Sequence, residues 1–296
     1  MKKIPVILDT DIGGDIDDTW ALAMLLKSPE LDLKLVVSDT GDTGYRAKIA
    51  AKMLEIANRT DVAVGVGIPY PAMGEPQEAW VSSYDLASYP GTVHADGVAA
   101  LIDTIMLSPE PITLICIGPV PNVGAALERE PRIARNARFV GMHGSVRRGY
   151  QGSAEVHAEY NVKQHTNSCQ QAFTAPWEMT ITPLDTCGLV VLDGERYRRV
   201  RQCQDPVIRA LMQNYDAWAA ACKLGDQAEH RSSVLFDTVA VYLAFTDALL
   251  VMEELPIRVT DDGFTRIDPA GKMMRVATEW KGLPAYEDFL VSRLID

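Results

Sequence analysis

Short apolar runs alternate with amphipathic helical stretches along this chain. The pattern predicts strands over residues 4–8, 33–39, 62–67, 112–118 and 137–144. It predicts helices over residues 19–29, 44–58, 95–107, 195–223 and 234–250. Strands that alternate with helices are typical of βαβ units, so we expect an α/β fold with an open, mostly parallel central sheet flanked by helices. No internal repeat or linker divides the sequence, which favours a single domain over residues 1–296.

Five aspartates follow the first predicted strand, in the segment DTDIGGDIDD at residues 9–18. Helix capping explains one or two carboxylates at the start of the next helix, but it does not explain five. Gly13 and Gly14 permit a tight turn that brings the acids together. Because like charges repel one another and Ca²⁺ and Mg²⁺ prefer oxygen ligands, we expect a hard divalent cation at this loop.

Composition narrows the class of partner. The formal net charge is −12, which disfavours nucleic acid and anionic membranes as partners. Five scattered cysteines without a C-x-x-C pair disfavour a disulfide framework and a zinc site. No apolar run reaches the length of a membrane span, and Met1-Lys2-Lys3 before the first strand is unlike a signal peptide. We therefore expect a cytoplasmic protein with a small-molecule partner.

A strand followed by D-x-D also occurs in haloacid-dehalogenase-type phosphatases, which use the first aspartate as a nucleophile. In those enzymes the two residues after D-x-D usually include Thr or Val, whereas this chain has Ile12-Gly13. The chain also has no convincing later lysine or paired acidic motif after a strand. A phosphatase is therefore a minor alternative.

A series of motifs resembles the Ca²⁺-dependent nucleoside hydrolases, the inosine–uridine-preferring superfamily. The opening motif of that family, D-x-D-x-G-x-D-D, is matched by DTDIGGDIDD, which is two residues longer. Further matches, in the family's order, are VVSDTGD (36–42), VHADG (93–97), ITLICIGPVPNVGAAL (112–127), VGMHG (140–144), AEYN (158–161) and ITPLDTC (181–187). The resemblance implies the Rossmann-like nucleoside hydrolase fold. It also implies hydrolysis of the N-glycosidic bond of a ribonucleoside or similar N-riboside, which yields ribose and free base.

The resemblance also assigns metal ligands. It implies that Ca²⁺ is held by Asp11, Asp18, Asp237 and the main-chain carbonyl of Ile117. Asp11 would remove a proton from a metal-bound water, and the surrounding carboxylates, including Asp237, would stabilise an oxocarbenium-like transition state. We expect Asp17 and Asp18 to be the D-D pair of the motif, because they directly precede the helix. If the two extra residues of the loop follow Asp15, that residue takes the first position of the pair instead.

Other residues are expected at the substrate. By resemblance, Asp17, Glu159 and Asn161 bind the sugar, and Asp42 stands where the family usually has Asn. Many members carry His immediately before the late aspartate, where it helps the base to leave. This chain has Phe236 there, so we expect Phe236 to stack on the base.

His94, in the VHADG match, is the best substitute polar group for the departing base and is expected to be catalytic. Because the leaving-group side departs from the family pattern, two alternatives stay open. One is a related hydrolase of another furanosyl or glycosyl substrate, and the other is a non-catalytic protein that binds Ca²⁺ and sugar. The resemblance further implies a homodimer or homotetramer.

Overall fold

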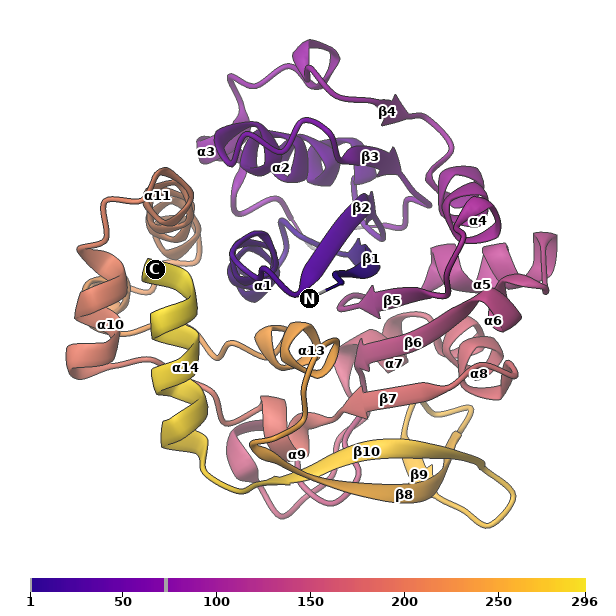
Figure 1. Cartoon of the computed structure of the whole chain (residues 1–296). Coiled ribbons are helices and arrows are strands. Elements are labelled where there is room, and N and C mark those ends of the chain that lie inside the picture. Colours follow the sequence, from indigo (N-terminus) through magenta and orange to yellow (C-terminus); the bar gives the residue numbers. More distant parts are fainter. Residues whose placement is uncertain (1, 72–73) are drawn as a thin grey trace.

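The computed structural model describes residues 2–71 and 74–296. Within these residues, one ten-stranded sheet has the order β4-β3-β2-β1-β5-β6-β7-β10-β8-β9 (Figure 1). The strands are β1 (Ile4–Thr10), β2 (Leu31–Ser38), β3 (Ala63–Val66), β4 (Val93–His94), β5 (Ile112–Cys116), β6 (Ala137–Met142), β7 (Met179–Thr182), β8 (Leu250–Val259), β9 (Thr265–Ile267) and β10 (Lys272–Trp280). Strands β1 to β7 pair in parallel, as do β7 and β10, whereas β8 is antiparallel to both β10 and β9. The expected α/β class and mostly parallel sheet are confirmed.

Helices cover both faces of this sheet (Figure 1). The helices on one face are α1 (Asp17–Leu26), α2 (Thr43–Ile56), α3 (Glu78–Val81), α9 (Leu184–Cys187), α10 (Gly194–Arg201), α11 (Pro206–Ala221), α12 (Gln227–His230), α13 (Thr238–Leu243) and α14 (Leu283–Ile295). Those on the other are α4 (Gly97–Leu107), α5 (Pro121–Arg129), α6 (Ile133–Asn136) and α8 (Thr166–Thr174). The short α7 (Tyr160–Gln164) precedes α8. Among the described residues, no helix is long and apolar enough to cross a membrane.

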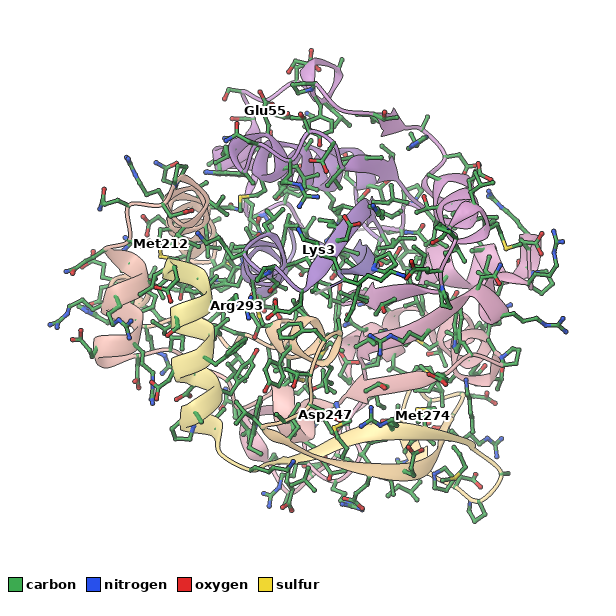
Figure 2. The ribbon with its side chains drawn as sticks, viewed as in Figure 1. Lys3, Glu55, Met212, Asp247, Met274 and Arg293 are labelled. Atoms are coloured by element: carbon green, nitrogen blue, oxygen red, sulfur yellow. The ribbon has the colours of Figure 1, made fainter. Side chains whose placement is uncertain are left out.

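Each face of the sheet has its own apolar core, and Figure 2 shows side chains filling the space between sheet and helices. In β1, Val6 and Leu8 belong to the core under α1 and α2, whereas Ile7 belongs to the core under α4 and α5. Successive strand residues point to opposite faces, so a strand covered on both sides is a continuous apolar run. This is why the apolar run at residues 4–8 predicted a buried parallel strand.

The second half of the chain differs from the sequence-based expectation. The predicted helix 195–223 is two helices, because Pro206 starts α11 and the Asp205 side chain accepts hydrogen bonds from the first turn. The predicted helix 234–250 is helical only over Thr238–Leu243, and Leu250 already begins β8. Strands β7 to β10 were not predicted. In β8 and β10 charged and apolar residues mix on half-exposed faces, and this leaves little periodic signal.

Candidate active site

A cavity of about 460 Å³ opens at the carboxyl ends of β1, β5 and β6. Asp11 follows β1, Ile117 follows β5 and Met142 ends β6, and all three line the cavity. Ligands of open α/β sheets bind outside these strand ends. The other described lining residues are Gly14, Asp15, Asp17, Asp18, Arg46, Gly74, Pro76, Tyr150, Glu159, Tyr160, Asn161, Trp218, Cys222, Phe236 and Asp237.

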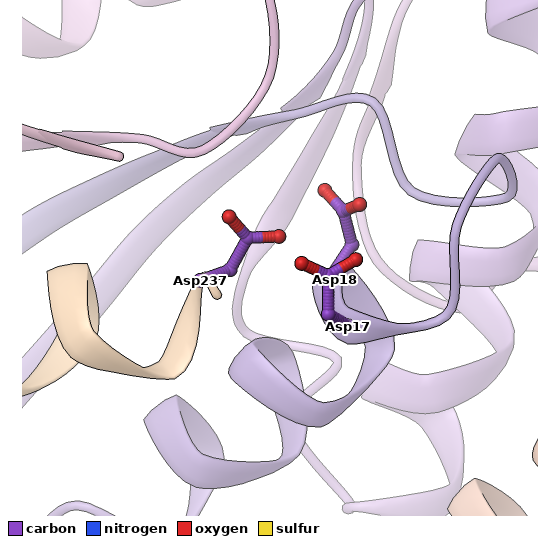
Figure 3. A group of neighbouring side chains, drawn as sticks. All are labelled: Asp17, Asp18 and Asp237. Carbon is purple, nitrogen blue, oxygen red and sulfur yellow. The ribbon is translucent and has the colours of Figure 1, made fainter. Parts of the chain in front are cut away.

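Three buried carboxylates converge in this cavity, those of Asp17, Asp18 and Asp237 (Figure 3). Each offers an oxygen within 4.8 Å of the others. Asp17 and Asp18 are the first two residues of α1, and Asp237 directly precedes α13. No capping hydrogen bond explains the group, because the residue before α1 is Ile16 and the Asp237 side chain caps nothing in α13.

The three-carboxylate group, Asp17, Asp18 and Asp237, is electrostatically costly by itself. Burial, followed by repulsion from neighbouring carboxylates, raises the pKa of each well above its ordinary value. Thr10 Oγ1 donates a hydrogen bond to Asp18 Oδ1 at 2.5 Å, which offsets part of this cost for one carboxylate. A bound cation offsets it for all three. Because every donor in the group is a carboxylate oxygen, the group fits a hard cation such as Ca²⁺ or Mg²⁺.

Asp11 lies beside this group and is held from two sides. Arg46 Nη1, from α2, lies 3.7 Å from Asp11 Oδ2 and donates a hydrogen bond to the Ile12 carbonyl oxygen at 3.2 Å. Burial raises the pKa of Asp11, and the Arg46 charge lowers it. On the other side, a Cβ atom on Gly118 would lie only 2.7 Å from the Asp11 backbone nitrogen. Arg46 and Gly118 therefore leave the Asp11 carboxylate little room to move.

All four ligands that the resemblance assigned, Asp11, Asp18, Asp237 and Ile117, line the cavity. The three-carboxylate group nevertheless contains Asp17 in place of Asp11. Asp15 also lines the cavity, but its side chain is exposed at the mouth. The placement therefore favours the choice of Asp17 and Asp18 as the D-D pair.

Glu159 and Asn161 lie at the start of α7, and both make local hydrogen bonds. Glu159 Oε2 accepts from the Gly144 amide at 2.9 Å, and Oε1 accepts from the Asn161 amide at 2.7 Å. Burial raises the pKa of Glu159 to about 7, although these amides oppose the shift. Asn161 Nδ2 donates to the carbonyl oxygens of Ile117 and Met142, each at 3.0 Å. Both residues thus order the cavity wall as well as facing it.

Phe236 lines the cavity directly before Asp237. Its ring meets that of Tyr150 edge to face, with 6.1 Å between the centroids. Phe236 is not a core residue, because it is only partly buried. An aromatic face at this position is available to a planar ligand.

Asp42 and His94 do not line the cavity, so the structure does not bring these two expected site residues together with the others. The exposed Asp42 side chain caps α2 by accepting a hydrogen bond from the Tyr45 amide at 2.9 Å. His94 is exposed on β4, the outermost strand at its edge of the sheet. Capping accounts for Asp42, and the edge position of β4 carries His94 away from the central strand ends.

The lining residues that sequence reasoning missed include Arg46, Met142, Tyr150, Tyr160 and Cys222. Met142 and Tyr160 lie inside the matched motifs VGMHG and AEYN, so those motifs could have indicated them. Arg46 had one weak signal, its place in the first turn of the helix after the second strand. Nothing in the local sequence predicts that its side chain enters the cavity.

A mostly parallel sheet with a carboxylate-lined cavity at its carboxyl edge defines an α/β protein whose carboxylate group could hold a metal ion. Residues 6–284 match the model of the family described as inosine-uridine preferring nucleoside hydrolase. The chain belongs to this family, as the motif series predicted. The phosphatase alternative is left without support.

Relatives and solved structures agree with this assignment. The chain is 28% identical over 201 residues to the non-specific ribonucleoside hydrolase RihC of Escherichia coli strain SMS-3-5, a match that covers 64% of each chain. It is 31% identical over 204 residues to RihC of Klebsiella pneumoniae, covering 65% of each. The matched region therefore spans a little under two thirds of these relatives.

Two solved structures share the fold almost from end to end. The plant nucleoside hydrolase PpNRh1 superposes with a TM-score of 0.84 at 20% identity, covering 99% of each chain. The purine-preferring ribonucleoside hydrolase from Gardnerella vaginalis gives 0.77 at 20% identity, covering 98% of each.

Proposed function

We propose that this protein hydrolyses the N-glycosidic bond of a ribonucleoside or similar N-riboside, with Ca²⁺ bound, to ribose and free base. The observation that carries the proposal is the meeting of Asp11 with the three-carboxylate group in one buried cavity at the carboxyl edge of the sheet. The family match supports the same reaction class.

The donor set supports Ca²⁺ as the resident ion. Ca²⁺ prefers about six to eight oxygen ligands, and Asp17, Asp18, Asp237, Asp11 and the Ile117 carbonyl all face the cavity. When bound, the ion would anchor the ribose hydroxyls and make a water more acidic. Because Asn161 Nδ2 takes up one side of the Ile117 carbonyl oxygen, that oxygen keeps one lone pair for a ligand.

The protein's own side chains carry out the remaining steps of the reaction. Asp11 accepts the proton of the attacking water, since it lines the cavity and the Arg46 charge opposes the rise in its pKa that burial causes. Asp17, Glu159 and Asn161 orient the sugar. Positive charge that develops on the ribose is stabilised by the surrounding carboxylates, which are fixed before substrate arrives. Phe236 stacks on the base.

We infer further that the protein works as a homodimer or homotetramer in a reducing, cytoplasmic setting. All five cysteines are free thiols, and three of them are buried. Buried free thiols suit a reducing compartment. Sedimentation velocity at micromolar concentration tests the oligomeric state.

The experiment is release of reducing sugar from a panel of purine and pyrimidine ribonucleosides, with Ca²⁺ and again after chelation. The Asp11→Asn variant preserves shape but cannot accept the proton, so we expect a loss of at least 10²-fold. Asp103→Asn, at an exposed position of α4, is the matched control and should keep full activity.

Four results would contradict the proposal. Full activity in Asp11→Asn removes Asp11 as the base, and release that survives chelation removes the metal requirement. No release from any nucleoside, although calorimetry detects Ca²⁺ and ribose binding, would favour the sugar-binding alternative. Turnover of other furanosides alone would favour the related glycosidase.

A further inference from the structure

One wall of the cavity makes no contact with the substrate in the reaction described above. It consists of Gly14, Arg46 and Trp218, and is here called the Arg46 wall. Trp218 Nε1, from α11, donates a hydrogen bond to the Gly14 carbonyl oxygen at 3.1 Å. A Cβ atom on Gly14 would lie 3.4 Å from Arg46 Nη2. The indole, the loop backbone and the guanidinium therefore form one continuous surface.

The Arg46 wall comes from different elements than Glu159 and Asn161, two of the groups assigned to the sugar. Its residues belong to the aspartate loop, α2 and α11, whereas Glu159 and Asn161 start α7 beyond β6. Asp11 is near both sides, because Arg46 Nη1 lies 3.7 Å from its carboxylate and the Asp11 charge contributes to the raised pKa of Glu159. A substrate whose sugar lies at the carboxylates and Glu159 therefore presents its other part, the aglycone, to the Arg46 wall.

Arg46 is a buried cation with spare donors. Its side chain is 5% exposed, and among the described lining residues it is the one cationic side chain. Nη1 donates to the Ile12 carbonyl oxygen, but no described residue accepts a hydrogen bond from Nε or Nη2. A guanidinium carries five N–H groups, and neither nitrogen is among the fully enclosed polar atoms that lack a partner. Both nitrogens are therefore open to the cavity that Arg46 lines, where a bound acceptor can reach them.

On the basis of the proposed function, we propose that Arg46 contacts the aglycone and stabilises the negative charge that builds up on it as it departs. The substrate class is then an N-riboside whose planar heteroaromatic aglycone carries an oxo or ring-nitrogen acceptor. Trp218 offers an aromatic surface to such a ring, and the guanidinium is suited to planar acceptors.

The chemical step balances without an added reactant. The bond between the anomeric carbon and the aglycone nitrogen breaks, and its electron pair leaves with the nitrogen. Water supplies the hydroxyl group to the anomeric carbon, and its proton ends on the aglycone. Arg46 keeps its own proton throughout, because a guanidinium does not deprotonate in proteins; it acts as a hydrogen-bond donor to the developing anion.

Competing donors in the cavity are poor. Phe236 has no proton to give, and no histidine is among the described lining residues. Burial raises the pKa of the Tyr150 and Tyr160 phenols to about 12, and Tyr150 Oη already accepts a hydrogen bond from the Tyr160 amide. Tyr160→Phe therefore serves as a comparison variant in the test.

The experiment compares two ribosides that differ in how much help the leaving group needs. Inosine requires stabilisation of the departing base, whereas 4-nitrophenyl β-D-ribofuranoside releases a stable anion unaided. A hydrogen bond to a charged group corresponds to about 10- to 100-fold in rate. We expect Arg46→Gln to lower kcat/KM for inosine by that factor beyond any loss on the nitrophenyl riboside, because the contact between Arg46 and Asp11 affects both substrates alike. Arg46→Lys, which keeps the charge, should fall between Gln and wild type.

Arg132→Gln, at an exposed position, is the matched control and should leave both substrates unchanged. Equal losses on the two substrates in Arg46→Gln would overturn the proposal, since a purely structural role affects both alike. A selective loss of inosine hydrolysis in Tyr160→Phe instead would transfer the role to that phenol. If wild type cleaves neither riboside, the proposed function fails before Arg46 is tested, so the two failures are distinguishable.

Discussion

Gly118 offers a sharp test of how closely Asp11 must be positioned. A Cβ atom at residue 118 would lie 2.7 Å from the Asp11 backbone nitrogen and 2.9 Å from both its Cβ and Oδ1 atoms. Ordinary van der Waals contact begins at 3.4 Å, so Gly118→Ala must push Asp11 back by about 0.5–0.7 Å. A displacement of about 1 Å in a catalytic group costs about 10²-fold in rate. We therefore expect kcat/KM for the best nucleoside to fall about 10- to 100-fold.

The same overlap should lower the free energy of unfolding by about 1–3 kcal/mol, the usual cost of overpacking. The assay is steady-state sugar release on folded protein, together with urea unfolding. Gly282→Ala is the matched control, because its Cβ would meet nothing closer than 3.8 Å. Full activity in Gly118→Ala, with the same stability as Gly282→Ala, would refute the view that the glycine positions Asp11.

Two further predictions concern stability. Burial lowers the pKa of His143 to about 3 from 6.5, so the unfolded chain takes up a proton that the folded chain refuses. The contribution of His143 to the free energy of unfolding is then full above pH 6.5 and falls as the pH drops, by about 2 kcal/mol at pH 5. Urea unfolding at pH 7 and pH 5 should show a smaller loss of stability in His143→Gln than in wild type. An equal loss in the two proteins would contradict the assignment. At the three-carboxylate group, saturating Ca²⁺ should raise the Tm of wild type, with about 2.7 kcal/mol expected at 100 times the Kd. Asp237→Asn removes a buried like charge, so it should be more stable than wild type in chelator but gain less from Ca²⁺; equal Ca²⁺ gains in both proteins would argue against ligation by Asp237.

Local patterns in the sequence determined much of this protein. Apolar runs such as residues 4–8 are strands because a parallel strand buries both of its faces, a requirement visible in consecutive residues. The position of the aspartate loop also follows from the buried first strand. A strand that ends in a buried sheet delivers the next residues, Asp11 above all, to the carboxyl edge where ligands bind. Family resemblance then linked the distant Asp237 to the same site, which periodicity alone does not do.

The tertiary structure decided what depends on partners remote in the chain. Asp42 and His94 fit the motif series, yet capping of α2 and the edge position of β4 remove them from the cavity. Arg46 had almost no local signal, but the packing of α2 against the aspartate loop directs its guanidinium to Asp11. Strands β8 and β10 likewise exist because each pairs with the other along its length. The position of a side chain depends on the elements that it packs against, and these elements are distant from it in the sequence.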